Sequence, residues 1–107
     1  MPKSYGLDCP VARTLDLIGD RWTLLVLRDL FLFRTRRFQD FSERLPGLTP
    51  SVLSARLKEL EESGVIESRL YSAHPPRSEY LLTDKGRTLG PILRSLQQWG
   101  EAHTTPE

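Results

Sequence analysis

The chain has 107 residues, of which 38% are hydrophobic and 27% charged, and its net charge is +1. This composition is that of an ordinary soluble globular protein, and the length predicts one domain over residues 1–107. The sequence contains no apolar run long enough for a membrane span and no secretion signal, and Cys9 as the single cysteine excludes an intramolecular disulfide framework. We therefore expect a protein of the reducing cytoplasm.

Positive charge is concentrated in one segment. Between residues 34 and 58, six basic residues stand against two acidic ones, a local excess of four positive charges. A chain that is nearly neutral overall can still present a basic face to nucleic acid. The other interpretation is an unevenly charged, solvated surface, and charge alone leaves both open.

Two helices are predicted at the start of the chain. Asp8 can act as an N-cap and Pro10 falls in the first turn, which favours a helix that stops at Gly19. Asp20 then caps a second helix over residues 21–33, whose apolar residues cover most of its circumference, as expected in the core or at a subunit interface. The first helix has its apolar residues at helical spacing, in Val11, Leu15 and Ile18.

A third and a fourth helix follow, separated by a tight turn. The apolar spacing predicts a short helix over residues 37–45, which Pro46-Gly47 breaks. Thr49 and Pro50 start the next helix, 50–63, and Gly64 ends it. The basic stretch 34–37 is too short for an independent strand, although it can pair briefly with one. In helix 50–63 the buried stripe is Leu53, Leu57 and Leu60, while Ser51, Ser54, Ala55 and Lys58 point away from it.

The last third predicts a β-hairpin and a long helix. Residues 65–71 and 79–82 have strand character, and the two prolines between them mark the hairpin tip because proline cannot donate a ladder hydrogen bond. Thr83 or Asp84 caps a final helix that runs to about residue 102. Gly90-Pro91 should kink it or loosen one turn. Its apolar stripe is Leu89, Ile92, Leu93, Leu96 and Trp99.

This order of elements predicts a mainly α (α+β) fold, a winged helix-turn-helix with a β-hairpin wing. Helices 37–45 and 50–63 are joined by a turn of the required length, and a hairpin with a basic tip follows. Small polar residues allow helix 50–63 to enter a major groove about 12 Å wide, and its N-terminus favours a phosphate. Arg77, with His74 and Arg69, can then reach the flanking backbone or minor groove.

A series of short motifs resembles those of HxlR-type transcriptional regulators, relatives of the MarR-like winged helices. The resemblance covers about residues 9–101, and the motifs are specific in combination although each is weak alone. They are CPV at 9–11, LIGDRW at 17–22, RFQDF at 37–41, LPGLT at 45–49, VLSARLKELE at 52–61, PPRSEY at 75–80, LTDKG at 82–86 and WG at 99–100.

The resemblance implies a homodimer on a palindrome in double-stranded DNA, with the N- and C-terminal helices as dimerisation helices. Repression is the simpler default for its action. For the dimer interface we expect Val11, Leu15, Trp22, Leu93, Leu96 and Trp99. For the DNA interface we expect Thr49, Ser51, Ser54, Ala55, Arg56 and Lys58, together with the basic residues Arg37 and Arg77.

Several of these residues have a plainer interpretation. Lys58 and Arg56 either contact DNA or pair with Glu59 or Glu62, and position favours DNA for Lys58 while leaving Arg56 open. The arginines of the 34–37 stretch either grip the DNA backbone or form a solubilising loop. Trp22 and Trp99 could line a ligand pocket, although such residues are more often anchors of a core or a dimer interface.

Cys9 is the candidate sensor. Some HxlR-type proteins use a cysteine at this position to detect oxidants or electrophiles, and a thiol near a helix N-terminus tends to be reactive. Two copies in a dimer could cross-link, or one could be modified. The alternative is a small buried apolar residue. The other candidate effector is a small molecule that binds the regulator.

The sequence argues against an enzyme. His74 and His103 lie in a predicted hairpin tip and tail, without nearby partners for catalysis, and no metal-binding, cofactor-binding or nucleophile motif is present. The remaining rival function is a winged helix that binds another protein. Such a module should carry large apolar residues on the outer face of helix 50–58, where this chain has small polar ones.

Overall fold

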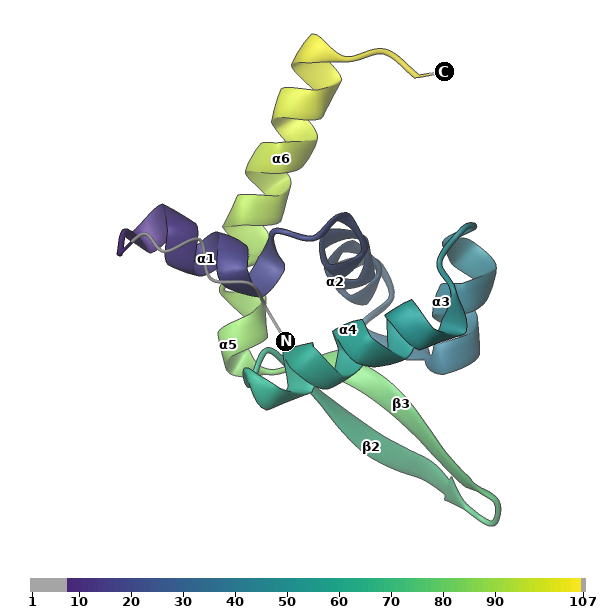
Figure 1. Ribbon diagram of the computed structural model, residues 1–107. Helices are drawn as coiled ribbons and strands as arrows, with labels where there is room; N and C mark the ends of the chain where they lie inside the picture. Colours follow the sequence, from purple (N-terminus) through teal and green to yellow (C-terminus); the bar gives the residue numbers. More distant parts are fainter. Residues whose placement is uncertain (1–7, 107) are drawn as a thin grey trace.

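The computed structural model describes residues 8–106. Six helices and three strands follow one another along this part of the chain (Figure 1). They are α1 (Pro10–Ile18), α2 (Arg21–Phe33), β1 (Thr35–Arg37), α3 (Phe38–Arg44), α4 (Pro50–Glu62), β2 (Ile66–Ala73), β3 (Pro76–Leu82), α5 (Asp84–Arg87) and α6 (Gly90–His103).

The helix starts follow local capping chemistry. The Asp20 carboxylate accepts hydrogen bonds from the backbone N–H groups of Trp22 and Thr23, as predicted for α2. The predicted cap of α1 was wrong by one residue. Cys9 is the N-cap, and its Sγ accepts a hydrogen bond from the Ala12 N–H at 3.3 Å. The carboxylate of Asp8 does not cap the helix and instead accepts a hydrogen bond from Arg13 Nη1 at 2.7 Å.

The wing is longer than the sequence indicated. β2 and β3 pair antiparallel from Ile66 opposite Leu82 to Ala73 opposite Pro76, so the tip is only residues 74–75, with a cis bond between His74 and Pro75. Pro76 is tolerated because it is the first residue of its strand. The brief pairing expected of the 34–37 stretch is present, because β1 pairs with β3 in a sheet of order β1-β3-β2.

The hydrophobic core lies where α2, α4 and the base of the sheet meet. The buried residues of α2 include Val26, Leu27 and Leu30, and α3 adds Phe41. The predicted stripe of α4 is buried as expected, with Leu53 at 0% exposure and Leu57 and Leu60 each at 2%. This packing fixes the rotation of α4 about its axis and so decides which of its residues face outward.

The break in the last helix is sharper than a kink. α5 is a single turn capped by the Thr83 hydroxyl, and α6 starts afresh at Gly90. Gly90 sits close to Phe31, since a Cβ there would lie 3.3 Å from the ring. α6 then projects away from the rest of the molecule (Figure 1). None of its residues is buried within the chain.

This arrangement is a winged helix-turn-helix, as predicted. Helices α3 and α4 form the helix-turn-helix, β2 and β3 form the wing, and β1 closes the sheet. Within residues 8–106, every helix is too short or too polar to span a bilayer.

Candidate nucleic-acid interface

The turn between α3 and α4 is held tightly. Leu45 and Leu48 are buried on either side of it, and Gly47 has a φ of +92° that suits glycine. A Cβ on Gly47 would lie 3.7 Å from the ring of Trp22, so this half-buried tryptophan supports the turn. The Thr49 hydroxyl then accepts a hydrogen bond from the Val52 N–H at 3.3 Å and starts α4.

The outward face of α4 carries small polar residues and one free lysine. Ser51, Ser54, Ala55 and Lys58 are all exposed, opposite the buried leucines. Lys58 has no ion-pair or hydrogen-bond partner within the described part of the chain. No large apolar side chain lies among these four. The face is therefore polar and narrow enough for the helix to enter a major groove.

Arg56 occupies a different position from Lys58. Its guanidinium donates from Nε to Asp20 at 3.2 Å and from Nη1 to Glu59 at 2.9 Å. Burial works against its charge, but the hydrogen bond to Glu59 and the charge of Asp20 outweigh it, so the pKa of Arg56 lies above its usual value. These contacts join α4 to the start of α2 and favour the pairing alternative, while DNA contact by Arg56 stays a prediction.

Arg37 and Arg77 lie beside the same hollow of about 500 Å³ between the start of α3 and the wing. The guanidinium of Arg37 stacks 4.0 Å from the centre of the Tyr71 ring. Tyr71 falls where the β2–β3 register shifts between Leu70 and Ser72, and such a bulge re-aims a side chain. The fold thus brings together a basic residue of β1 and one of the wing.

The other predicted wing residues differ in their availability. Arg77 is exposed and makes no ion pair with any described residue, and His74 is exposed at the tip. Arg69, in contrast, lies 3.7 Å from the carboxylate of Glu79 on the paired strand. Arg77 is therefore the freest cation of the wing.

A buried carboxylate supports the base of this surface. Asp29 of α2 is 0% exposed. Its Oδ1 accepts hydrogen bonds at 3.2 Å from both Arg28 and Arg44, and its Oδ2 lies 3.8 Å from Arg36. Arg36 and Arg44 also lie over the ring of Phe33. The cluster joins α2 to β1 and α3, so two of the basic residues near the surface are structural.

The predicted dimer residues fall into two groups. Val11 and Leu15 on α1 are 70% and 45% exposed, and Leu96 and Trp99 on α6 are 50% and 63% exposed. Trp22 and Leu93 are instead half-buried against the core. Cys9 is exposed at the N-terminal end of α1.

Three supporting residues escaped sequence reasoning. Asp29 interrupts an apolar helix in the sequence, and a carboxylate at such a position is a signal of burial with a charged partner. Tyr71 was assigned only strand character, and its bulge depends on pairing with β3. Asp20 was predicted only as a cap, and its ion pair spans 36 residues to Arg56.

Fold and surface together define a helix-turn-helix protein of the winged type. The profile of the HxlR-like helix-turn-helix family matches residues 17–107. The chain belongs to this family of transcriptional regulators.

Individual relatives agree with the assignment. The uncharacterized HTH-type transcriptional regulator YdeP of Bacillus subtilis is 41% identical over 95 residues, which cover 89% of this chain and 73% of YdeP. The redox regulator HypR in its oxidized form is 37% identical, with a TM-score of 0.84 over 92% of this chain and 100% of that one. The reduced form of the transcriptional regulator YodB from B. subtilis is 29% identical, with a TM-score of 0.75 over 94% of this chain and 99% of YodB.

Proposed function

We propose that this regulator binds a palindromic operator as a homodimer, represses transcription, and responds to oxidants through Cys9. The observation that carries the DNA-binding part is the exposed face of α4, where small polar residues and Lys58 stand opposite a fully buried leucine stripe. Two copies of α4 enter successive major grooves, about 34 Å apart on one side of the duplex. Arg77 and Arg37 contact the flanking backbone.

Dimerisation through α1 and α6 is supported by their uncovered apolar residues. Val11, Leu15, Leu96 and Trp99 are all exposed in the single chain. Large apolar patches that are left exposed on a small protein commonly mark interaction sites. A two-fold axis beside α6 would bury the apolar residues of this helix, none of which is buried within its own chain.

The redox part is supported by the position of Cys9 and by two relatives. Cys9 is exposed and caps α1, on the side of the molecule proposed for the dimer. Among the solved relatives, the redox regulator HypR is known in an oxidized form and the transcriptional regulator YodB in a reduced form. Diamide would take two electrons and two protons from two Cys9 thiols, and so form one disulfide between the copies.

The test of DNA binding is a mobility-shift titration of the full chain on the upstream region of its own gene, at several salt concentrations. Lys58→Ala should weaken specific binding by about 1–3 kcal/mol if it contacts a base, or reduce the salt slope by about 0.9 if it contacts a phosphate. Arg21→Ala on α2, an exposed cation that makes no ion pair with any described residue, is the control and should bind like the parent. If the parent gives no sequence-specific, salt-sensitive shift, whether reduced or oxidised, the proposal is wrong and a protein-binding role gains weight.

The redox part has a separate test. Diamide should change the DNA affinity of the parent and produce a cross-linked dimer on a non-reducing gel. Cys9→Ser should do neither. A Cys9→Ser variant that responds to diamide as the parent does would rule out sensing by this thiol.

A further inference from the structure

A charged contact ties the flank of α4 to the start of α2. The Oδ2 atom of Asp20 accepts hydrogen bonds from the backbone N–H groups of Trp22 at 2.9 Å and Thr23 at 3.2 Å, which start α2. The same atom accepts a hydrogen bond from Nε of Arg56 in α4 at 3.2 Å. Nη1 of Arg56 donates to Glu59, one turn further along α4, at 2.9 Å. A single carboxylate therefore caps one helix and holds another.

The surroundings of Arg56 are unfavourable for contact with a DNA phosphate. Its side chain is 27% exposed, and both Nε and Nη1 already donate to carboxylates. Two negative charges beside one positive charge leave a local excess of negative charge, which repels a phosphate. The exposed Lys58 on the outer face of α4 has no carboxylate partner among the described residues. The two cations of this helix therefore have different environments.

Base recognition requires α4 to be placed accurately in the groove. Groups that recognise a partner by hydrogen bonds must be held within about 0.5 Å, by packing and by supporting hydrogen bonds. The buried leucines of α4 decide which side of the helix faces the core, but hydrophobic burial is non-directional. A charged hydrogen bond is directional and short, so the Asp20–Arg56 contact restricts sliding of α4 along α2 more sharply. The turn before α4 is held from the same place, since Gly47 lies next to the ring of Trp22.

We propose that the Asp20–Arg56 contact positions α4 for base recognition, and that Arg56 affects DNA affinity through the placement of this helix and not by touching DNA. Asp20 and Arg56 are then positioning residues, and the proposal rests on the DNA binding proposed above. When the contact is broken, a smaller fraction of copies carries α4 in the binding orientation, and the apparent affinity falls with that fraction. Non-specific binding depends on charge and not on base contacts, so this loss does not affect it.

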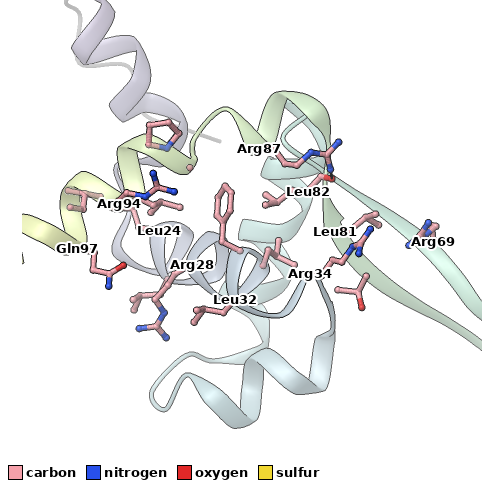
Figure 2. A pocket seen from close by; sticks show the side chains of 18 residues that line it. Leu24, Arg28, Leu32, Arg34, Arg69, Leu81, Leu82, Arg87, Arg94 and Gln97 are labelled. Carbon is pink, nitrogen blue, oxygen red and sulfur yellow. Dashed lines mark hydrogen bonds between the residues drawn. The ribbon is translucent and has the colours of Figure 1, made fainter.

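The location of Asp20 connects the contact to the side of the molecule proposed for the dimer. Gly19 alone separates α1 from Asp20, and a Cβ on Gly19 would lie 2.5 Å from the carbonyl oxygen of Leu15, so this junction is closely packed. Further along, α2 contacts α6, and an open pocket of about 1330 Å³ lies between α2, β3 and α6. Figure 2 shows Leu24 of α2 and Arg94 of α6 among its lining. A shift of α1 or α6 against a second copy would therefore reach α4 through α2.

The experiment is a mobility-shift titration of the full chain on the upstream region of its own gene and on an unrelated duplex, at several salt concentrations. The variants are Asp20→Asn, which keeps an efficient helix cap but removes the charge, and Arg56→Gln. Each should lower the ratio of specific to non-specific affinity about tenfold, because a partly exposed ion pair is lost in both copies of the dimer. The salt dependence should stay that of the parent, since no phosphate contact is lost. Destabilisation alone would lower both affinities equally and leave the ratio unchanged.

The controls remove the same charges elsewhere. Glu62→Gln removes an exposed carboxylate from α4, and Arg21→Gln removes an exposed guanidinium from α2. Neither residue makes an ion pair with any described residue, and both variants should leave the ratio unchanged. Removal of a negative charge near DNA favours binding on electrostatic grounds, so weaker specific binding by Asp20→Asn points to positioning. If Asp20→Asn behaves like Glu62→Gln, or if Arg56→Gln lowers the salt slope by about 0.9 as a phosphate contact would, the proposal is wrong.

A double-mutant cycle shows whether the two residues act as a pair. Asp20→Asn combined with Arg56→Gln should lower the affinity ratio no further than either change alone, whereas additive losses would overturn the proposal. The same cycle measured by denaturant unfolding needs no DNA. If the parent binds no DNA specifically, the proposed function fails and the positioning role fails with it, while coupling in unfolding still measures the contact. If the parent binds specifically and the residues are coupled in unfolding, but neither variant changes the affinity ratio, the positioning role alone is wrong.

Discussion

Helices α4 and α6 are both amphipathic, and the fold treats their apolar faces in opposite ways. In α4, Leu53, Leu57 and Leu60 are all buried within the chain, and the outer face is polar. In α6, no residue is buried, and Leu96 and Trp99 remain open. The comparison shows that apolar spacing identifies which side of a helix needs cover, but it does not show whether the same chain supplies that cover.

The largest expected effect on the free energy of unfolding comes from Asp29, the buried carboxylate of α2 that joins this helix to β1 and α3. Asp29→Ala should lower the free energy of unfolding by about 3–5 kcal/mol, because it leaves the guanidinium of Arg36, which is only 17% exposed, without its carboxylate partner. Denaturant titration measures the change. Asp8→Ala, which breaks an exposed pair with Arg13, is the control and should change stability little. Equal effects of the two substitutions would mean that the cluster is not structural.

The next largest effect on stability should come from shortening a side chain in the buried leucine stripe of α4. Leu57→Ala should lower the free energy of unfolding by about 2–5 kcal/mol through lost burial and a cavity. The unfolding midpoint should fall by the same amount at every protein concentration, since the contact lies within one chain. Ala55→Gly on the exposed face of the same helix should cost about 1 kcal/mol from helix propensity alone. A small loss for Leu57→Ala would contradict the packing described for α4.

Truncation on the α6 stripe should behave differently. Trp99→Ala should weaken association by about 2 kcal/mol if this tryptophan anchors a dimer. Its unfolding midpoint should then fall below that of the parent at concentrations where the parent is dimeric, and the difference should shrink on dilution. Sedimentation across a dilution series measures the association directly, with Gln98→Ala as the neighbouring exposed control. An unchanged monomer–dimer balance would show that α6 is covered by something other than a second copy.

These contrasts also mark what the sequence could predict. Thr49-Pro50 and Asp20 are local signals, because a cap acts on residues two or three positions away, and both helix starts were predicted correctly. The leucine stripe of α4 and the break at Gly90-Pro91 follow from spacing and from proline geometry. Pairing of residues 34–37 with some strand was foreseen, but the identity of the partner, β3, and the contact of Arg56 with Asp20 depend on residues more than thirty positions away. No local pattern encodes such contacts.

The interface residues show the same division. The exposed polar face of α4 was predictable because it lies opposite a recognisable apolar stripe. The environment of Arg37 was not, since it depends on a bulge that aims Tyr71 from another element. The pocket beside α6 was also beyond sequence reasoning, because its lining comes from α2, β3 and α6, which are distant in the chain.

The smallest expected effect concerns the contact between the wing and the start of α3, and it tests how much this contact stabilises the fold. The stacked pair Arg37–Tyr71 joins the start of α3 to the bulge in β2 at 4.0 Å. A double-mutant cycle of Arg37→Gln and Tyr71→Leu should give a coupling energy of about 0.5–1 kcal/mol in the free energy of unfolding, as for an exposed cation–π contact. The cycle of Arg77→Gln with Tyr71→Leu is the control and should give none, because no stacking joins those two. Coupling of zero between Arg37 and Tyr71 would mean that the stacked pair does not stabilise the fold, and that the pairing of β1 with β3 alone holds Arg37 beside the wing.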